Sequence, residues 1–143
     1  MIVLIQNTSL LAFLAAAAFT DKRKHSLSRI LLAAGAAGGI ALQIVIREES
    51  VLSILGGCAI GLVLLLICFL SRGGIGPGDG LSFVVSGIFL GFYANLFLLL
   101  FSSVLSGLAA LFLIVVKKYK KKHNIPFMPF VLCGYVCLLL FAA

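Results

Sequence analysis

The strongest constraint on this chain is a succession of apolar runs, each about as long as a helix needs to cross a lipid bilayer. Such a helix takes about 20 predominantly apolar residues. The 143 residues are 63% hydrophobic and only 10% charged. About a quarter of the residues of a soluble globular domain are charged, and a disordered chain has low hydrophobicity, so both classes are excluded. We expect an all-α membrane protein that forms a single domain over residues 1–143.

Charged or glycine-rich segments separate the apolar runs from one another. Residues 81–116 are apolar throughout, and as one helix they would extend roughly 54 Å. That length exceeds a hydrocarbon core of about 30 Å, so we divide this run into two spans with a turn near residues 91–95. The prediction is a bundle of six transmembrane helices, with spans in residues 2–20, 30–46, 51–70, 81–116 (two spans) and 126–143.

The basic residues indicate how the chain is oriented. The net charge is +7, and Lys and Arg gather between apolar runs at residues 22–29, at Arg72 and at residues 117–122. Cytoplasmic loops are enriched in Lys and Arg, so we expect these segments on the cytoplasmic side and both termini outside. The pattern favours a multi-pass protein of the inner (cytoplasmic) membrane over a nucleic-acid-binding protein. Residues 117–122 also suit contact with anionic lipid head groups.

Small and polar residues inside the apolar runs are interpreted as packing residues. Glycines four residues apart let helices approach closely, and we expect these contacts within one bundle rather than between two copies. Gln43 is expected to form an interhelical hydrogen bond, and Asn95 to serve the turn. The four cysteines form no CxxC pair, so neither a metal site nor a disulfide framework is predicted, and no cofactor is expected. The glycine pairs are Gly35/Gly39, Gly57/Gly61 and Gly87/Gly91.

The chain has only two aspartates, Asp21 and Asp79, and the predicted topology places both at the cytoplasmic ends of spans. A carboxylate at a membrane boundary is costly unless it is solvated, is paired with another group or takes part in the protein's function. Two carboxyl groups that share a site can hold one proton between them. One can then donate to a peptide carbonyl while the other takes a proton from water. The alternatives are an interfacial ion pair for Asp21 and a helix N-cap for Asp79.

The segment around Asp79 is rich in glycine, because five of the eight residues 73–80 are glycines. Glycine adopts backbone conformations closed to other residues and lets the chain approach a ligand closely. A flexible turn and a phosphate cradle are alternative interpretations. The phosphate cradle lacks the Lys-Ser/Thr pair that follows the glycines of a P-loop.

Three motifs together resemble the bacterial type IV prepilin peptidases. GPGD at residues 76–79 is a GxGD motif, the mark of membrane aspartyl proteases. DKRK at residues 21–24 is similar to the first aspartate of that family, which follows an apolar span and begins a short basic segment. IPFMPF at residues 125–130 is similar to the Ile-Pro-Phe-x-Pro-Phe stretch that opens the family's last span. The motifs occur in the family's order along the whole chain.

The resemblance implies a GxGD aspartic endopeptidase that cleaves the leader peptide of type IV prepilins or pseudopilins at the cytoplasmic face. By position, Asp21 and Asp79 would be the catalytic pair, and Gly76 and Gly78 would shape the loop that presents Asp79. Residues 27–29 and 80–81 depart from the family's frequent Ile-Pro-Asn and Val-Lys, which bears on substrate preference. Many members also carry a methyltransferase region with a cysteine-pair metal site. No such region is recognised here, so the expectation is cleavage without N-methylation.

Three alternatives stay open from the sequence. The first is a small non-enzymatic transporter or channel whose ion path is lined by Asp21 and Asp79. The second is an inactive relative that keeps the fold as a scaffold or assembly partner. The third is a presenilin-like protease that cuts inside transmembrane helices, but Thr20 stands before Asp21 where that group has a tyrosine.

Overall fold

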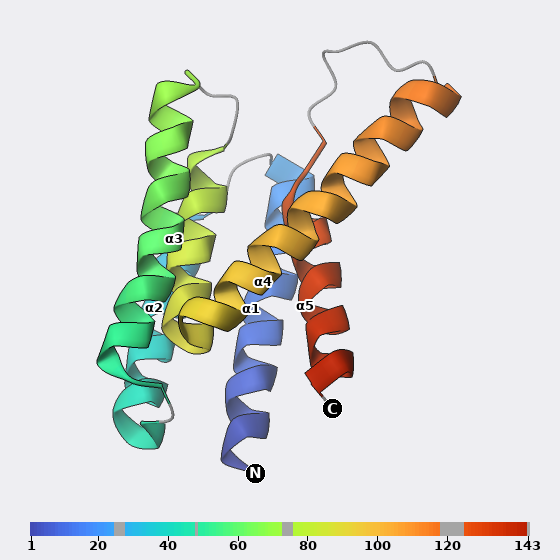
Figure 1. Cartoon of the computed structure of the whole chain (residues 1–143). Coiled ribbons are helices and arrows are strands. Elements are labelled where there is room, and N and C mark those ends of the chain that lie inside the picture. The colour runs from blue at the N-terminus through green and yellow to red at the C-terminus, as the bar shows by residue number, and fades with distance from the viewer. Residues whose placement is uncertain (25–27, 48, 73–75, 118–124, 143) are drawn as a thin grey trace.

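The chain is mostly helical in the part that the computed structural model describes, which is residues 1–24, 28–47, 49–72, 76–117 and 125–142. This part contains five helices and no strand (Figure 1). The all-α prediction is confirmed. The count of six helices is not confirmed, because five are counted: the run predicted as two spans lies in α4, in which two helical segments join across a kink at Gly91. The helices are α1 (Ile2–Lys24), α2 (Arg29–Ile46), α3 (Val51–Leu70), α4 (Pro77–Lys117) and α5 (Met128–Ala142).

The helices have the length and surface of membrane-spanning elements. Within the described residues, α1, α2, α3 and α4 are long and apolar enough to cross a membrane, whereas α5 has 15 residues and is shorter. Large apolar side chains face outward, with Phe69 80% and Phe141 86% exposed. A water-soluble monomer rarely exposes apolar surface on this scale. The protein is therefore a multi-pass membrane protein.

Helix α4 bends at Gly91, inside the interval where the sequence predicted a turn. Gly91 has φ 71° and ψ −167°, a conformation that is essentially restricted to glycine. The first segment of α4, residues 77–90, runs beside α3. The second segment, residues 92–117, turns back toward the end of the molecule at which α4 begins (Figure 1). The bend therefore shortens the distance that this long apolar helix covers across the membrane.

Two glutamine side chains bind the carbonyl groups that the bend leaves without helical partners. A helix end frees its last carbonyls, and inside a membrane such groups need partners within the protein. The amide of Gln43 in α2 donates to the carbonyls of Ile88 at 2.9 Å and Phe89 at 3.4 Å. The amide of Gln6 in α1 donates to the same Phe89 carbonyl. The predicted interhelical hydrogen bond of Gln43 is thus confirmed.

The helical segment after the bend is capped from α3. The N–H of Phe92 donates to the hydroxyl oxygen of Ser53 at 3.1 Å. The Ser53 hydroxyl in turn donates to the carboxylate of Glu49 at 2.7 Å. A negative charge close to a helix start is favourable, so Glu49 and Ser53 stabilise the beginning of the second segment.

Asn95 ties both segments of α4 to α3. Its side chain is fully buried. The amide nitrogen donates to the carbonyls of Gly57 at 2.9 Å and Phe83 at 3.0 Å, and the amide oxygen accepts from the Ser86 hydroxyl at 2.7 Å. Asn95 serves the turn, as predicted, by fixing how far the second segment can swing from the first.

The glycine pairs pack within the bundle, as the sequence predicted. A Cβ atom on Gly57 would lie 2.7 Å from the carbonyl oxygen of Gly87, and one on Gly61 would lie 2.8 Å from that of Gly80. The backbones of α3 and the first segment of α4 are therefore in direct contact. On α2, a Cβ atom on Gly39 would lie 2.8 Å from the ring of Phe89.

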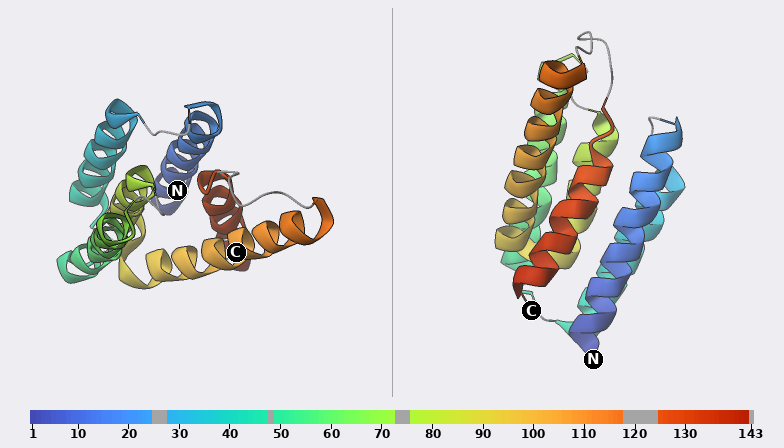
Figure 2. Two further views of the ribbon diagram at one scale, coloured as in Figure 1. Left: turned by 90° about the horizontal axis from the view of Figure 1, so that it is seen from above. Right: turned by 90° about the vertical axis from the view of Figure 1, so that its right-hand side faces the viewer.

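Helix α5 completes the bundle by packing against α1 and α4. Figure 2 shows it between α1 and the second segment of α4. Both chain termini lie at one end of the molecule, and the start of α4 lies at the other (Figure 1). The fully buried side chains where these helices meet include Leu10, Leu14, Phe83, Leu98, Val131 and Tyr135.

Candidate active site

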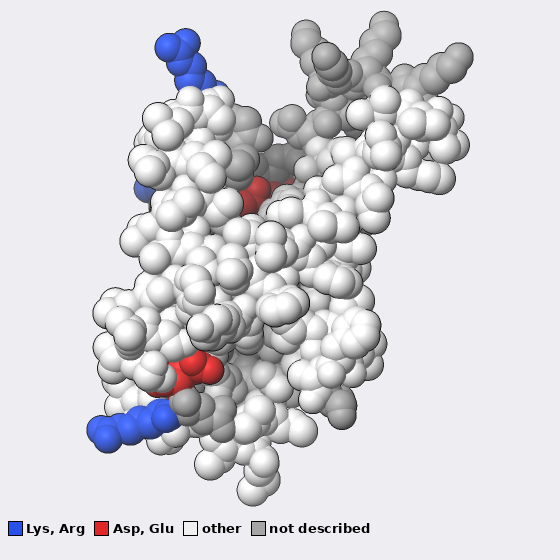
Figure 3. Space-filling view, in the orientation of Figure 1, with Lys and Arg blue, Asp and Glu red and all other residues white. Residues whose placement is uncertain are grey.

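The structure brings Asp21 and Asp79 together. Asp21 lies in the last turn of α1 and Asp79 in the first turn of α4, at the end of the molecule away from the termini (Figure 1). Both side chains are half-buried, and their carboxyl groups are close enough for their charges to interact. Figure 3 shows acidic surface in a hollow toward this end. Two residues from distant parts of the chain thus form one acidic site.

The local sequence explains how α4 presents Asp79. Pro77 is the first residue of α4, a position that tolerates proline because the N–H there has no helical partner. The N–H of Asp79 donates to the carbonyl of Gly76 at 3.1 Å, and its side chain lies near the positive end of the helix. The helix begins at residue 77 rather than 81, so Asp79 belongs to the helix and not to the loop before it.

The glycines near Asp79 differ in what they do. A Cβ atom on Gly76 would lie 3.4 Å from Oδ2 of Asp79, which is an ordinary contact. Gly76 is exposed and Gly78 is half-buried, and among the glycines that the structure describes only Gly91 has a positive φ. The described backbone therefore shows no steric need for glycine at position 76. Residues 73–75 of the predicted loop lie outside the described residues.

Gly80 is the glycine that packing requires at this site. A Cβ atom there would lie 2.8 Å from Cγ and 3.1 Å from the backbone nitrogen of Leu65 on α3. Gly80 stands where the prepilin peptidases often have valine. This departure from the family pattern therefore has a structural reason, because it lets the start of α4 lie directly against α3.

The start of α5 forms the third part of the site. The N–H of Met128, the first residue of α5, donates to Oδ2 of Asp21 at 3.4 Å. Such an N–H has no partner within its own helix, and the positive helix end complements a carboxyl group. The ring of Phe127 lies 6.3 Å from that of Phe83, one turn beyond Asp79. The IPFMPF stretch thus contacts both aspartate-bearing helices, a relationship that was not predicted.

Ser82 is a residue near the site that was not predicted. It lies three residues after Asp79, is 1% exposed, and its hydroxyl has no hydrogen-bond partner in the described part of the chain. The buried hydroxyls of Ser86 and Ser102, by contrast, both form hydrogen bonds. An unpaired buried hydroxyl costs about 1–3 kcal/mol. The sequence could have indicated that Ser82 lies near the site through its spacing from Asp79, because residues three positions apart are neighbours on a helix.

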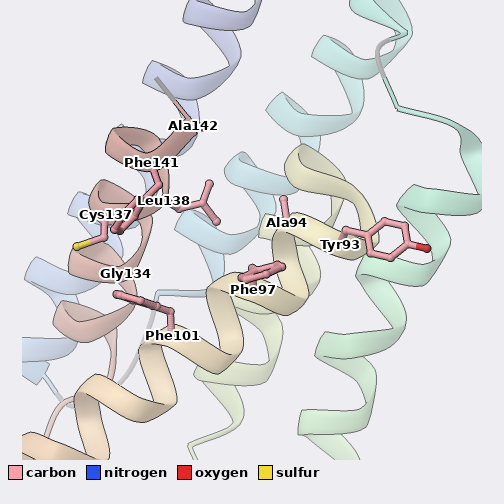
Figure 4. A pocket seen from close by; sticks show the side chains of 9 residues that line it. All are labelled: Tyr93, Ala94, Phe97, Phe101, Gly134, Cys137, Leu138, Phe141 and Ala142. Atoms are coloured by element: carbon pink, nitrogen blue, oxygen red, sulfur yellow. The ribbon is translucent and has the colours of Figure 1, made fainter.

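A cavity lies away from the aspartates, between the second segment of α4 and α5 (Figure 4). Its volume is about 510 Å³. Phe97 and Phe101 line it from α4, and Leu138 and Phe141 from α5. None of its lining residues is a carboxylate or a cation, so this cavity does not supply a catalytic pair. Within the described residues, no three His, Cys, Asp or Glu side chains come together as a metal site would need.

The fold and the site define a multi-pass helical membrane protein with an interacting pair of aspartates at one end of its bundle. A sequence model of the type IV leader peptidase family matches residues 8–111, a range that includes both aspartates and the glycine-rich segment. The chain therefore belongs to the type IV leader peptidase family. Comparison with curated proteins and with solved structures gave no match. The matched range ends before α5, so the contact of Met128 with Asp21 extends the site beyond it.

Proposed function

We propose that this protein is an aspartic endopeptidase that removes the leader peptides of type IV prepilins or pseudopilins at the cytoplasmic face of the inner membrane, without N-methylation. Membership of the type IV leader peptidase family supports a protease of this kind. The observation that carries the aspartic mechanism is the interaction between the carboxyl groups of Asp21 and Asp79. No other pair of described aspartate or glutamate side chains interacts in this way at that end of the bundle.

The proposed reaction uses the two aspartates in opposite protonation states. The protonated one donates a hydrogen bond to the scissile carbonyl, and the ionised one takes a proton from the attacking water. Two neighbouring carboxyl groups favour this state, because like charges hinder the ionisation of both. The Met128 N–H orients the Asp21 carboxyl group, and Gly76 lies beside the carboxyl group of Asp79.

The basic residues support the cytoplasmic face as the side of cleavage. Arg29 begins α2 and Arg72 follows α3, at the end of the molecule that carries the aspartates (Figure 1). Lys and Arg are enriched in cytoplasmic segments of membrane proteins. In this orientation the aspartates lie near the cytoplasmic boundary of the membrane, and both termini lie on the other side.

Co-expression with a type IV prepilin, in a bacterial host that lacks its own leader peptidase, tests the proposal. The wild type should shorten the prepilin on a gel, and N-terminal sequencing locates the cut. Asp21→Asn and Asp79→Asn should each reduce cleavage below detection at equal amounts of folded protein. Glu49→Gln makes the same chemical change in an acidic residue at the opposite end and should still cleave.

Two outcomes would contradict the proposal. Cleavage by either aspartate variant would exclude the pair as the catalytic groups. A folded wild type that processes no prepilin would instead favour the inactive scaffold or the transporter. Transfer of a labelled methyl group from S-adenosylmethionine to the cleaved pilin would contradict the expected absence of N-methylation, without affecting the assignment of the protease.

A further inference from the structure

The proposed reaction leaves the buried hydroxyl group of Ser82 unexplained. Its Oγ has almost no accessible surface and no hydrogen-bond partner among the described residues. The other buried serines of α4, Ser86 and Ser102, each donate to a carbonyl of their own helix, a bond that a serine inside a helix readily forms. Leaving a buried hydroxyl unpaired lowers the stability of a protein. We therefore expect the Ser82 hydroxyl to find a partner in another state of the protein.

Ser82 lies on the side of α4 that faces α1 and α2. Residues seven positions apart lie on the same side of a helix, and Phe89 follows Ser82 by seven positions. The carbonyl of Phe89 accepts from Gln6 of α1, and its ring packs where a Cβ atom on Gly39 of α2 would lie. The hydroxyl of Ser82 is therefore enclosed between helices. It contacts neither a substrate peptide nor the attacking water, so it can influence the reaction only through a neighbouring side chain.

Asp79 is the neighbour within reach of this hydroxyl. The Cβ atoms of residues three positions apart on a helix are about 5–6 Å from each other, a gap that a hydroxyl oxygen and a carboxyl oxygen can close to hydrogen-bond length. Ser82 is 1% exposed and held by packing, whereas Asp79 is half-buried. A rotation of the Asp79 side chain would bring one of its oxygens to the hydroxyl. Asp21, the other aspartate, already accepts the N–H of Met128.

We propose that Ser82 is a positioning residue, which donates a hydrogen bond to the carboxylate of Asp79 once Asp79 has given up its proton. The inference rests on the proposed function and assigns Asp79 as the acid and Asp21 as the base. The Met128 N–H suits Asp21 to this role, because a donor stabilises negative charge.

The first step of the reaction then proceeds as follows. Asp21 takes a proton from water, the water oxygen bonds to the scissile carbonyl carbon, and the carbonyl oxygen receives the proton of Asp79. Asp79 is now a carboxylate, and the Ser82 hydroxyl becomes its donor. Because the structure shows this hydroxyl unpaired, the bond forms only as charge develops on Asp79. Hydrogen bonds of catalytic groups commonly tighten at that stage, and an interaction made only then raises kcat without changing substrate binding.

Steady-state cleavage of a purified prepilin in detergent tests the proposal. Ser82→Ala should lower kcat at least about tenfold, the loss expected for a hydrogen bond to a charged group, and should leave KM unchanged. Ser102→Ala makes the same change in a buried serine of the same helix, whose hydroxyl donates to Leu98, and should keep the wild-type kcat. A wild-type kcat in Ser82→Ala, a loss confined to KM, or an equal loss in Ser102→Ala would overturn the proposal.

Thermal unfolding in detergent separates this role from a structural one. Ser82→Ala removes an unpaired buried hydroxyl, so its unfolding midpoint should equal that of the wild type or exceed it by a few degrees. The variant should therefore fold and cleave slowly. A midpoint several degrees below the wild type would show that the hydroxyl is already paired in the folded protein, and this result would also overturn the proposal.

The same measurements distinguish a failure of this inference from a failure of the proposed function. A folded wild type that cleaves no prepilin would refute the protease and with it the role of Ser82. If the wild type cleaves, Asp79→Asn does not, and Ser82→Ala cleaves at the wild-type rate, only the role of Ser82 is refuted.

Discussion

The backbone N–H of Met128 donates a hydrogen bond to Oδ2 of Asp21 over 3.4 Å, although the two residues are 107 positions apart in the chain. The contact joins the first turn of α5 to the last turn of α1. Helix α5 carries neither aspartate, yet this backbone group makes it part of the candidate active site. The carboxyl group of Asp21 is thus oriented by a main-chain donor, which among substitutions of Met128 only proline removes.

Removing this N–H should slow leader cleavage. Met128→Pro deletes the donor, and proline is tolerated at the first helical position. Met128→Ala removes the same buried side chain but keeps the N–H, so it is the matched control. We expect Met128→Pro to cleave about tenfold more slowly than Met128→Ala, in rates measured on gels at equal amounts of membrane-inserted protein. Equal rates would show that the N–H plays no part in the reaction.

Asp79→Asn should separate activity from stability. The carboxyl groups of Asp21 and Asp79 are close enough for their charges to interact, so they lie together only at the cost of holding one proton between them. Asparagine carries no charge and avoids this cost. We expect this variant to lose cleavage while its thermal unfolding midpoint in detergent equals or exceeds that of the wild type by a few degrees, about the shift that 1 kcal/mol produces. A midpoint several degrees below the wild type would instead assign Asp79 a structural role.

Asn95→Ala should destabilise the bundle more than a substitution that removes only a hydrogen bond within one helix. The variant loses three hydrogen bonds, one from the second segment of α4 to α3 and two to the first segment of α4. Polar bonds in membranes contribute about 0.6 to 1.7 kcal/mol each. The expected loss is about 2 to 4 kcal/mol in reversible unfolding by a denaturing detergent. Ser102→Ala, which loses only a bond to Leu98 of its own helix, should lose less than about 1 kcal/mol. Similar losses would contradict the bridging role of Asn95.

Gly57→Ala and Gly38→Ala should act in opposite directions. A Cβ atom on Gly57 would meet the backbone of Gly87, whereas nothing lies within 4 Å of one on Gly38. We expect Gly57→Ala to lower the free energy of unfolding by at least about 2 kcal/mol through overpacking. Gly38→Ala should leave it unchanged or raise it by up to about 1 kcal/mol, since alanine favours helix. A tolerated Gly57→Ala would mean that α3 and α4 are not in backbone contact.

Several features of the fold were predictable because they depend on the chain locally. The length of each apolar run, at 1.5 Å per helical residue, indicated membrane-spanning helices and required a bend within residues 81–116. Gly91 is the only described residue of α4 with φ above zero, and glycine is the residue that adopts such a conformation most readily. Gln43, a polar residue alone in an apolar helix, had to find a partner inside the protein.

The sequence by itself determined that this protein is a helical membrane protein with its two aspartates at helix ends, because hydropathy and charge fix which segments enter the bilayer and where they leave it. Only the tertiary structure decided that α4 starts before Asp79, that its two segments join directly across a kink at Gly91, and that Asp21 receives the N–H of Met128. It also decided that Gln6 and Gln43 share one carbonyl. The physical reason is that partner choice depends on distances between helices, and these are set by side-chain volumes and glycine contacts from several segments at once.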